Sequence, residues 1–229
     1  MNQNQQMSES LLLCSILAVT GGFLDTYTYI CRGKVFANAQ TGNMVLLGLN
    51  IAEKNFKNAF YYLIPIVAFA LGVLLSEQIK HHYKNNNDIN IHWRQIIILI
   101  ETIILLIVGF LPIGNFDMTA NVAISFICSL QVESFRKVNG NAFATTMCTG
   151  NLRSATELFH KYILTKDKTI KNKSFQYINI ILLFIFGAVI GVFITNVFQE
   201  KAVFFCCILL MIVFFIMFIK SKEEKTSEN

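Results

Sequence analysis

The sequence is poor in charged residues, which make up 14% of its 229 residues, against roughly 25% in ordinary globular domains. Hydrophobic residues reach 54% and are gathered in long blocks. The blocks 95–113 and 202–219 each approach the roughly 20 residues that a helix needs to cross a bilayer. These features exclude an ordinary soluble domain and predict an all-α integral membrane protein.

Motifs that would mark several other functions are missing. The six cysteines form no C-x-x-C pair, and no His, Cys, Asp or Glu cluster has metal-ligand spacing. We therefore expect buried thiols, and neither a metal nor a cofactor. No G-x-x-x-x-G-K-[ST] loop occurs, which excludes ATP-driven transport by this chain alone. No lysine or arginine precedes the first apolar block and no cleavage site follows it, so we expect a retained helix there.

Six segments are predicted to cross the membrane. They are 11–30, 59–79, 95–113, 118–135, 176–198 and 202–219. The fourth is interrupted by polar residues, and a polar span normally faces protein or water instead of lipid. Most basic residues lie in 80–94, in 136–175 and after 219, which places both termini in the cytoplasm. The same bias accounts for the net charge of +5, so no nucleic-acid partner is expected.

The tripeptide Thr-Gly-Asn occurs twice, at 41–43 and at 149–151, with an offset of 108 residues (149 − 41). At the same offset Asp25 aligns with Glu133, and "AFALGVLLSE" is later answered by "GAVIGVFITN". Matches in the same order predict two repeats within one domain. The single membrane domain is 1–229, with repeats at about 10–113 and 118–220 and a charged cytoplasmic tail at 221–229.

Each Thr-Gly-Asn begins a predicted helix that does not cross the membrane fully. A helix over 41–52 would be roughly 18 Å long, against a hydrocarbon core of about 30 Å. Its counterpart contains Arg153, Glu157 and His160. Both are predicted to be half-span or re-entrant helices, which leaves three full crossings per repeat and inverts the second repeat. Inverted repeats with paired short helices and a site at mid-depth are a recurring plan of transporters.

The stretches that carry these features are "GGFLDTYTYICRGKVFANAQTGNMVLLG" (21–48) and "SLQVESFRKVNGNAFATTMCTGNL" (129–152). They resemble the YoaK family of bacterial membrane proteins, and the resemblance extends over nearly the whole chain. It implies a polytopic protein of the bacterial cytoplasmic (inner) membrane, in a domain-of-unknown-function family. It implies no established substrate and no catalytic residue.

A solute site is predicted where the two Thr-Gly-Asn segments meet at mid-depth. The start of a helix carries free N–H groups and partial positive charge, which suit an anion, while amide and hydroxyl side chains suit a polar solute. The candidate binding residues are Asn38, Gln40, Thr41, Gly42, Asn43, Thr145, Thr146, Thr149, Gly150 and Asn151. The alternative is structural, because Thr and Asn are good N-caps and could simply begin two short helices.

Four ionisable residues in or beside the predicted spans are candidates for proton coupling or for ion pairs: Asp25, Arg32, Glu101 and Glu133. A charge at membrane depth costs at least about 2.5–3.5 kcal/mol on insertion scales. A salt bridge from Asp25 to Arg32, two helical turns away, is the structural alternative for that pair. For Glu101, a polar contact between helices is the leading interpretation, with proton coupling second.

Small residues spaced by four predict close contacts between helices. The two faces of this kind are formed by Ala68 with Gly72 and by Gly187 with Gly191.

We expect a small secondary transporter or permease for a small polar or anionic solute, working by alternating access. An enzyme is not expected, since no nucleophile elbow and no histidine within a span occurs. Two alternatives stay open: an intramembrane enzyme with Asp25 and Glu133 as acid and base, and a scaffold or sensor that transports nothing. The expected partners are the lipid bilayer and an unknown small solute, with a homo-oligomer left open.

Overall fold

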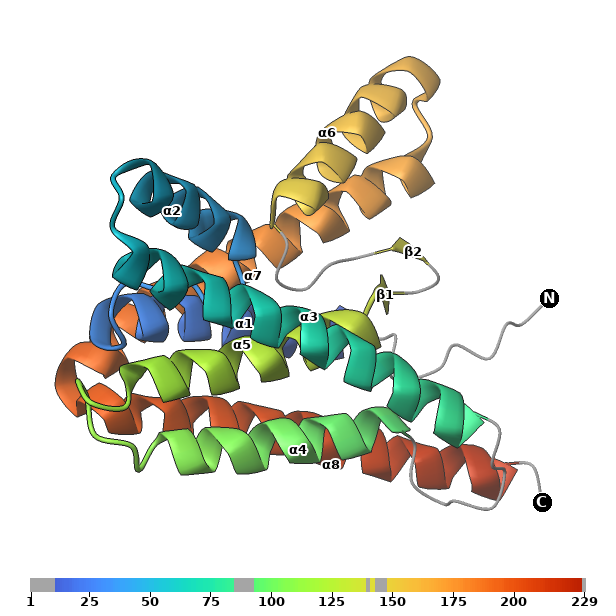
Figure 1. The fold of residues 1–229 in the computed structure, drawn as a ribbon. Helices are drawn as coiled ribbons and strands as arrows, with labels where there is room; N and C mark the ends of the chain where they lie inside the picture. Colours follow the sequence, from blue (N-terminus) through green and yellow to red (C-terminus); the bar gives the residue numbers. More distant parts are fainter. Residues whose placement is uncertain (1–10, 85–92, 139–140, 143–147, 228–229) are drawn as a thin grey trace.

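The computed structural model describes residues 11–84, 93–138, 141–142 and 148–227 (Figure 1), and the all-α class is confirmed for these ranges. The helices are α1 (Leu11–Cys31), α2 (Gln40–Ala52), α3 (Phe56–Lys84), α4 (Trp93–Val108), α5 (Asp117–Ser134), α6 (Cys148–Thr165), α7 (Lys168–Phe198) and α8 (Phe204–Ser227). The 3₁₀ helix η2 (Gln199–Val203) joins α7 to α8. The two-residue strands β1 (Lys137–Val138) and β2 (Asn141–Ala142) pair antiparallel.

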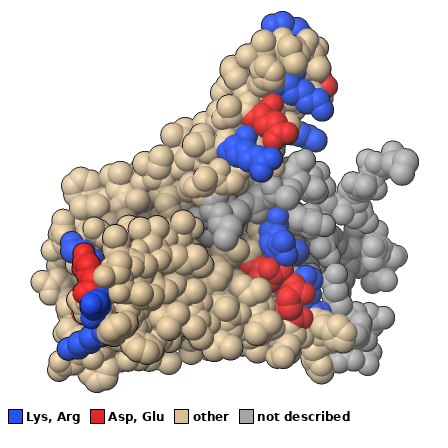
Figure 2. Space-filling view, turned by 45° about the horizontal axis from the view of Figure 1, so that its top comes forward, with Lys and Arg blue, Asp and Glu red and all other residues tan. Residues whose placement is uncertain are grey.

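Within the described residues, three helical segments are long and apolar enough to cross a membrane: Leu11–Cys31, Phe56–His82 and Lys168–Met217. Large apolar side chains on them face outward, including Leu74 on α3 at 61% exposure and Val197 on α7 at 73%. Figure 2 shows the charged side chains gathered at separate ends of the described surface, with a broad uncharged area between them. This distribution suits a body surrounded by lipid. The expected number of six crossings remains a prediction.

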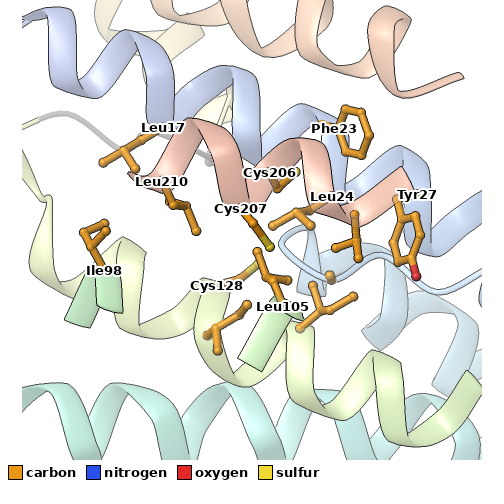
Figure 3. Packing of buried hydrophobic residues seen from close by; sticks show 14 of the residues in the cluster. Leu17, Phe23, Leu24, Tyr27, Ile98, Leu105, Cys128, Cys206, Cys207 and Leu210 are labelled. Atoms are coloured by element: carbon orange, nitrogen blue, oxygen red, sulfur yellow. The ribbon is translucent and has the colours of Figure 1, made fainter. Parts of the chain in front are cut away.

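The core lies between α1, α4, α5 and α8 (Figure 3). Leu17, Phe23 and Leu24 of α1 are buried against residues of the other three helices, and the Phe23 ring stacks on Phe205 with centroids 5.2 Å apart. The expected burial of thiols is confirmed for Cys14, Cys128, Cys206 and Cys207, whereas Cys31 and Cys148 are half-buried.

The polar side of α5 faces protein, as predicted for this span. Asn121, Ser125, Ser129 and Gln131 are all at most 2% exposed. Ser129 donates to the carbonyl of Phe126 one turn earlier, while the Gln131 side chain donates to Leu17 of α1 at 3.3 Å. These hydrogen bonds satisfy the Ser129 hydroxyl and the Gln131 amide away from water, whereas Asn121 Oδ1 has no hydrogen-bond partner within the described residues.

Two helix crossings depend on glycine. At Gly187 of α7, an added Cβ would run into the backbone of Val19 on α1, and at Gly191 it would press on Phe23 one turn along. At Gly72 of α3, it would meet the Ser129 hydroxyl and the Phe126 carbonyl of α5. Ala68, one turn before Gly72, is 6% exposed. The small residues thus lie where α1 meets α7 and where α3 meets α5.

We predict that Gly187→Ala lowers the stability of the protein in detergent by about 1–3 kcal/mol, because the new methyl group overpacks a contact between two backbones. Thermal unfolding followed by circular dichroism measures the change. The control is Gly48→Ala in α2, where an added Cβ meets nothing within 4 Å. Equal melting temperatures for the two variants would contradict the assigned crossing.

Candidate polar site at the start of helices α2 and α6

The chain reverses direction after α1 and returns along it. Gly33 and Lys34 adopt φ angles of 80° and 63°, in the left-handed region, and these two residues make the turn tight. The returning segment is then bonded to α1 in two places. The backbone N–H of Asn38 donates to Asp25 Oδ1 at 2.7 Å, and the Asn38 side chain donates to the Gly21 carbonyl at 3.1 Å.

Asp25 is the negative group at the start of α2. This helix begins at Gln40, and its N-cap residue, Ala39, has no side chain that could accept from the free amides. The Asp25 carboxylate, 7% exposed on α1, accepts from Asn38, and the amides of Ala37 and Ala39 also interact with it. Free backbone amides in an apolar setting need partners, and a carboxylate near a helix start is favourable. The protein's own aspartate thus occupies the position predicted for an anion.

The first Thr-Gly-Asn segment holds the same turn together through Asn43, not through an N-cap. The buried Asn43 side chain accepts from the Phe36 N–H at 3.2 Å and donates to the Phe36 carbonyl at 2.7 Å. It also donates to Gln40 Oε1 at 2.9 Å, and Gln40 in turn donates to the Ala37 carbonyl at 2.8 Å and to Ser125 of α5 at 3.3 Å. Thr41 is exposed, and Gly42 leaves room for the Phe36 ring.

The second Thr-Gly-Asn segment begins α6 near the same carboxylate. Cys148, the first residue of α6, is close enough to Asp25 for that charge to act on its thiol. Asn151 is 2% exposed, whereas Thr149 and Gly150 face outward. Figure 1 shows α2 and α6 beginning near the middle of the molecule and running toward opposite ends. Of the predicted binding residues, Thr145 and Thr146 lie outside the described residues.

Arg32 caps the end of α4 and does not pair with Asp25. The side chain is fully buried, and its guanidinium donates to the carbonyls of Val108, Leu111 and Pro112 at 2.9–3.3 Å. Its ionic partner is Asp117 at the start of α5, at 3.4 Å. The expected Asp25–Arg32 pair is therefore replaced by other partners for both residues. The reason is that the reversal after α1 turns Arg32 toward α4 while Asp25 faces the returning chain.

Three further side chains complete the Arg32 junction, and the sequence reading missed them. Tyr27 OH accepts from Arg32 Nε at 3.0 Å and Nη2 at 2.8 Å, and it donates to the Glu200 carbonyl at 3.1 Å. Tyr61 OH and the Asn121 side chain both donate to the Arg32 carbonyl. The one available signal was the position of both tyrosines near the ends of apolar spans. Nothing in the sequence pairs them with Arg32.

Glu133 lies in a second charged cluster on α3 and α5. It binds Arg136 at 3.0 Å and lies 3.9 Å from Lys80, which binds Glu77 at 2.6 Å. Asp25 and Glu133, the proposed acid and base, thus have separate partners. The remaining candidate, Glu101, is 2% exposed, and its Oε1 has no hydrogen-bond partner within the described part of the chain.

These features define a helical membrane protein in which two helices, α2 and α6, begin near one buried carboxylate. The chain belongs to the family described as "Protein of unknown function (DUF1275)", which matches residues 13–216. It is also similar to the "UPF0700 transmembrane protein YoaK" of Bacillus subtilis (strain 168), with 26% identity over 189 residues, covering 78% of this chain and 80% of the relative. The expected family is thereby confirmed. No solved structure matches the chain.

We predict that Asn43→Ala destabilises the protein, because it leaves the Phe36 amide, the Phe36 carbonyl and Gln40 Oε1 without their bonds. Each buried unpaired group costs about 1–3 kcal/mol. The neighbouring Thr41→Ala, at an exposed position, should change the free energy of unfolding by less than about 0.5 kcal/mol. Thermal unfolding of both variants tests this. Equal effects would exclude Asn43 as the residue that holds the turn.

We predict that loss of the Arg32 side chain strongly destabilises the protein. Arg32→Ala leaves Asp117 and three carbonyls without their donor, and breaking a buried charge pair costs about 3–5 kcal/mol. The control is Arg153→Ala in α6, which removes an arginine from an exposed position and should change the free energy of unfolding little. We expect the first variant to melt well below the second in detergent. Indistinguishable melting curves would show that Arg32 contributes little.

Proposed function

We propose that this chain is a small secondary transporter for a small polar solute, working by alternating access between two inverted halves in a bacterial cytoplasmic membrane. The observation that carries the proposal is the placement of α2 and α6. α2 begins at Asp25, α6 begins close to it, and the two then run toward opposite ends of the molecule. In transporters, paired broken or short helices surround binding sites at mid-depth.

Equivalent packing in the two halves supports an inverted repeat. α1 packs on α7 as α5 packs on α3, and α2 packs on α3 as α6 packs on α7, while α4 and α8 pack on each other. The turns also correspond. Lys54 between α2 and α3 has a φ of 58°, and Lys166 between α6 and α7 has a φ of 56°. The two lysines are 112 residues apart (166 − 54), four more than the 108 residues between the Thr-Gly-Asn segments, and α6 is five residues longer than α2 (18 − 13).

The dimensions of α2 support three full crossings in the first half. Its 13 residues rise about 20 Å, which is short of a core of about 30 Å. Its counterpart α6 is longer, with 18 residues that rise about 27 Å, but it exposes Arg153, Glu157 and Lys161, and such residues are costly against lipid. With α2 and α6 inserted only part of the way, each half has three crossings and the second half is inverted.

The positions of the two charged junctions support alternating access between the halves. Arg32 ties α1 of the first half to Asp117 of the second. Lys80 of α3 and Arg94 of α4 reach Glu133 and the Ser134 carbonyl at the far end of α5. Each junction joins one half to the other, at opposite ends of α5. Opening one while the other stays closed would expose the region of Asp25 to one side at a time.

Asp25 also bears on the chemistry of the solute. An anion would compete with this carboxylate for the amides at the start of α2, so it requires a protonated Asp25. A polar solute with N–H or O–H donors complements the carboxylate directly, and Asn38 Oδ1, which has no hydrogen-bond partner within the described residues, adds a neutral acceptor. We therefore favour a neutral or zwitterionic polar solute over a simple anion. Catalysis by Asp25 and Glu133 has no such support, given their separate partners.

Proteoliposomes that contain the purified protein should take up one member of a panel of radiolabelled sugars, amino acids and organic acids. Asp25→Asn keeps an acceptor for the Asn38 amide, and we expect it to fold but to lose at least about tenfold in uptake, or about 1.4 kcal/mol in binding. Glu157→Gln, on the exposed face of α6, should leave uptake unchanged.

Three outcomes would change this account. Folded wild-type protein without uptake of any panel member would contradict transport and favour a scaffold or sensor. Uptake of organic acids alone, unaffected by Asp25→Asn, would favour the anionic solute. Chemical turnover of a panel member without its accumulation would favour the enzyme.

A further inference from the structure

Glu101 differs from the other carboxyl groups of the candidate site. It lies halfway along α4 and is 2% exposed. Asp25 accepts from a backbone amide, Asp117 pairs with Arg32, and Glu133 pairs with Arg136. Within the described ranges, Glu101 Oε1 has no hydrogen-bond partner at all. A buried acid that lacks a partner requires an explanation beyond packing.

The elements packed around Glu101 bring thiols and apolar side chains to it. Cys128 of α5 lies close enough for the Glu101 charge to act on its thiol. On α8, Cys207 donates to the carbonyl of Thr102 at 3.9 Å, and Cys206 lies within reach of Cys128. All three thiols point into the same core (Figure 3). From α3, Leu75 and Ile79 pack near the start of α4.

The nearest cation on the same helix is engaged elsewhere. Arg94 lies two helical turns before Glu101. It donates to the Ser134 carbonyl at 2.8 Å and stacks against Trp93. An ionised carboxylate among thiols and aliphatic side chains would lack a compensating charge, and the penalty for burying such an ion is several kcal/mol. Burial without a compensating charge in the described residues therefore favours the neutral form of Glu101, in which the carboxyl group carries a proton.

A polar path connects Glu101 to the break between α1 and α2. The Cys128 thiol interacts with the charges of both Glu101 and Asp25, and it also contacts the Asn38 side chain. Asn38 donates to Asp25 through its backbone, while its own Oδ1, on a side chain 4% exposed, has no partner within the described residues. Glu101 Oε1 and Asn38 Oδ1, both without such a partner, thus belong to side chains that act on the same thiol.

We propose that Glu101 is a proton-binding site that is loaded and emptied once in each transport cycle. The inference rests on the proposed transport function. When one half opens, water reaches the carboxyl group, its O–H bond breaks, and the proton passes to water as hydronium. The Glu101 carboxylate remains and takes a proton back from hydronium on the other side. Asp25 keeps its hydrogen bond from the Asn38 backbone amide throughout the cycle. The change of charge on Glu101 reaches Asp25 through Cys128 and Asn38.

The test is infrared spectroscopy of the purified full-length protein in lipid. We expect a carboxylic-acid C=O band that shifts in deuterium oxide and fades as pH rises. Glu101→Gln should lose the band, whereas Asp25→Asn and Glu133→Gln should retain it. Glu101→Asp is the second variant, and it should restore a shifted band if the glutamine variant folds poorly.

Each alternative result contradicts the proposal. An acid band that survives in Glu101→Gln assigns the proton elsewhere. A band that neither exchanges with deuterium nor titrates marks a permanently buried acid, and the absence of an acid band in the wild type marks an ionised Glu101.

A second measurement separates this inference from the transport proposal. Proteoliposomes with a trapped pH-sensitive dye should change internal pH during solute uptake by the wild type and show no such change with Glu101→Gln. Uptake by the wild type without a pH change would overturn proton coupling and leave transport standing. If no solute is taken up, the transport proposal fails, and the infrared result alone decides whether Glu101 binds an exchangeable proton.

Discussion

The rest of the structure depends on the contact between the Asp25 carboxylate and the backbone amide of Asn38. An interrupted backbone at membrane depth has to satisfy its free amides without help from water. Here a carboxylate on α1 does so at 2.7 Å, and Asn43 closes the same turn by bonding both backbone groups of Phe36. With that turn held, α2 can begin in the interior and point outward, and α6 can begin close to the same charge.

The sequence predicted local features well. Each predicted apolar segment is helical for most of its length, α2 and α6 begin at the Thr-Gly-Asn segments, and the polar face of α5 is buried. Two helices end or begin at residues other than the limits of the predicted spans. α4 stops at Val108 because Gly109, Pro112 and Gly114 follow, although the apolar run continues to 113. α7 begins at Lys168, since Asp167 caps it through the Thr169 amide, whereas the predicted span began only at 176.

Long-range pairings could not be predicted. Arg32 reaches Val108 and Asp117, which follow it by 76 and 85 residues, and those contacts depend on how the helices rotate and cross. The spacing of Asp25 and Arg32 on one helix favours a pair, but it contains no information about the turn at Gly33 and Lys34. The structural role of Thr-Gly-Asn could be predicted only in part, because Asn43 bonds backward to Phe36 instead of capping its own helix.

The proposed two-fold plan would account for the matching contacts of α1 with α7 and of α5 with α3. Lys54 lies between α2 and α3, and Lys166 lies between α6 and α7. Both lysines are exposed, so their positions test that plan directly. An amine-reactive, membrane-impermeant reagent applied to right-side-out and to inverted vesicles, followed by peptide mass spectrometry, reports the side of each lysine. Inverted halves predict that Lys54 is labelled from the outside and Lys166 from the cytoplasmic side. Labelling of both lysines from the same side would contradict the inverted arrangement and the transport proposal that rests on it.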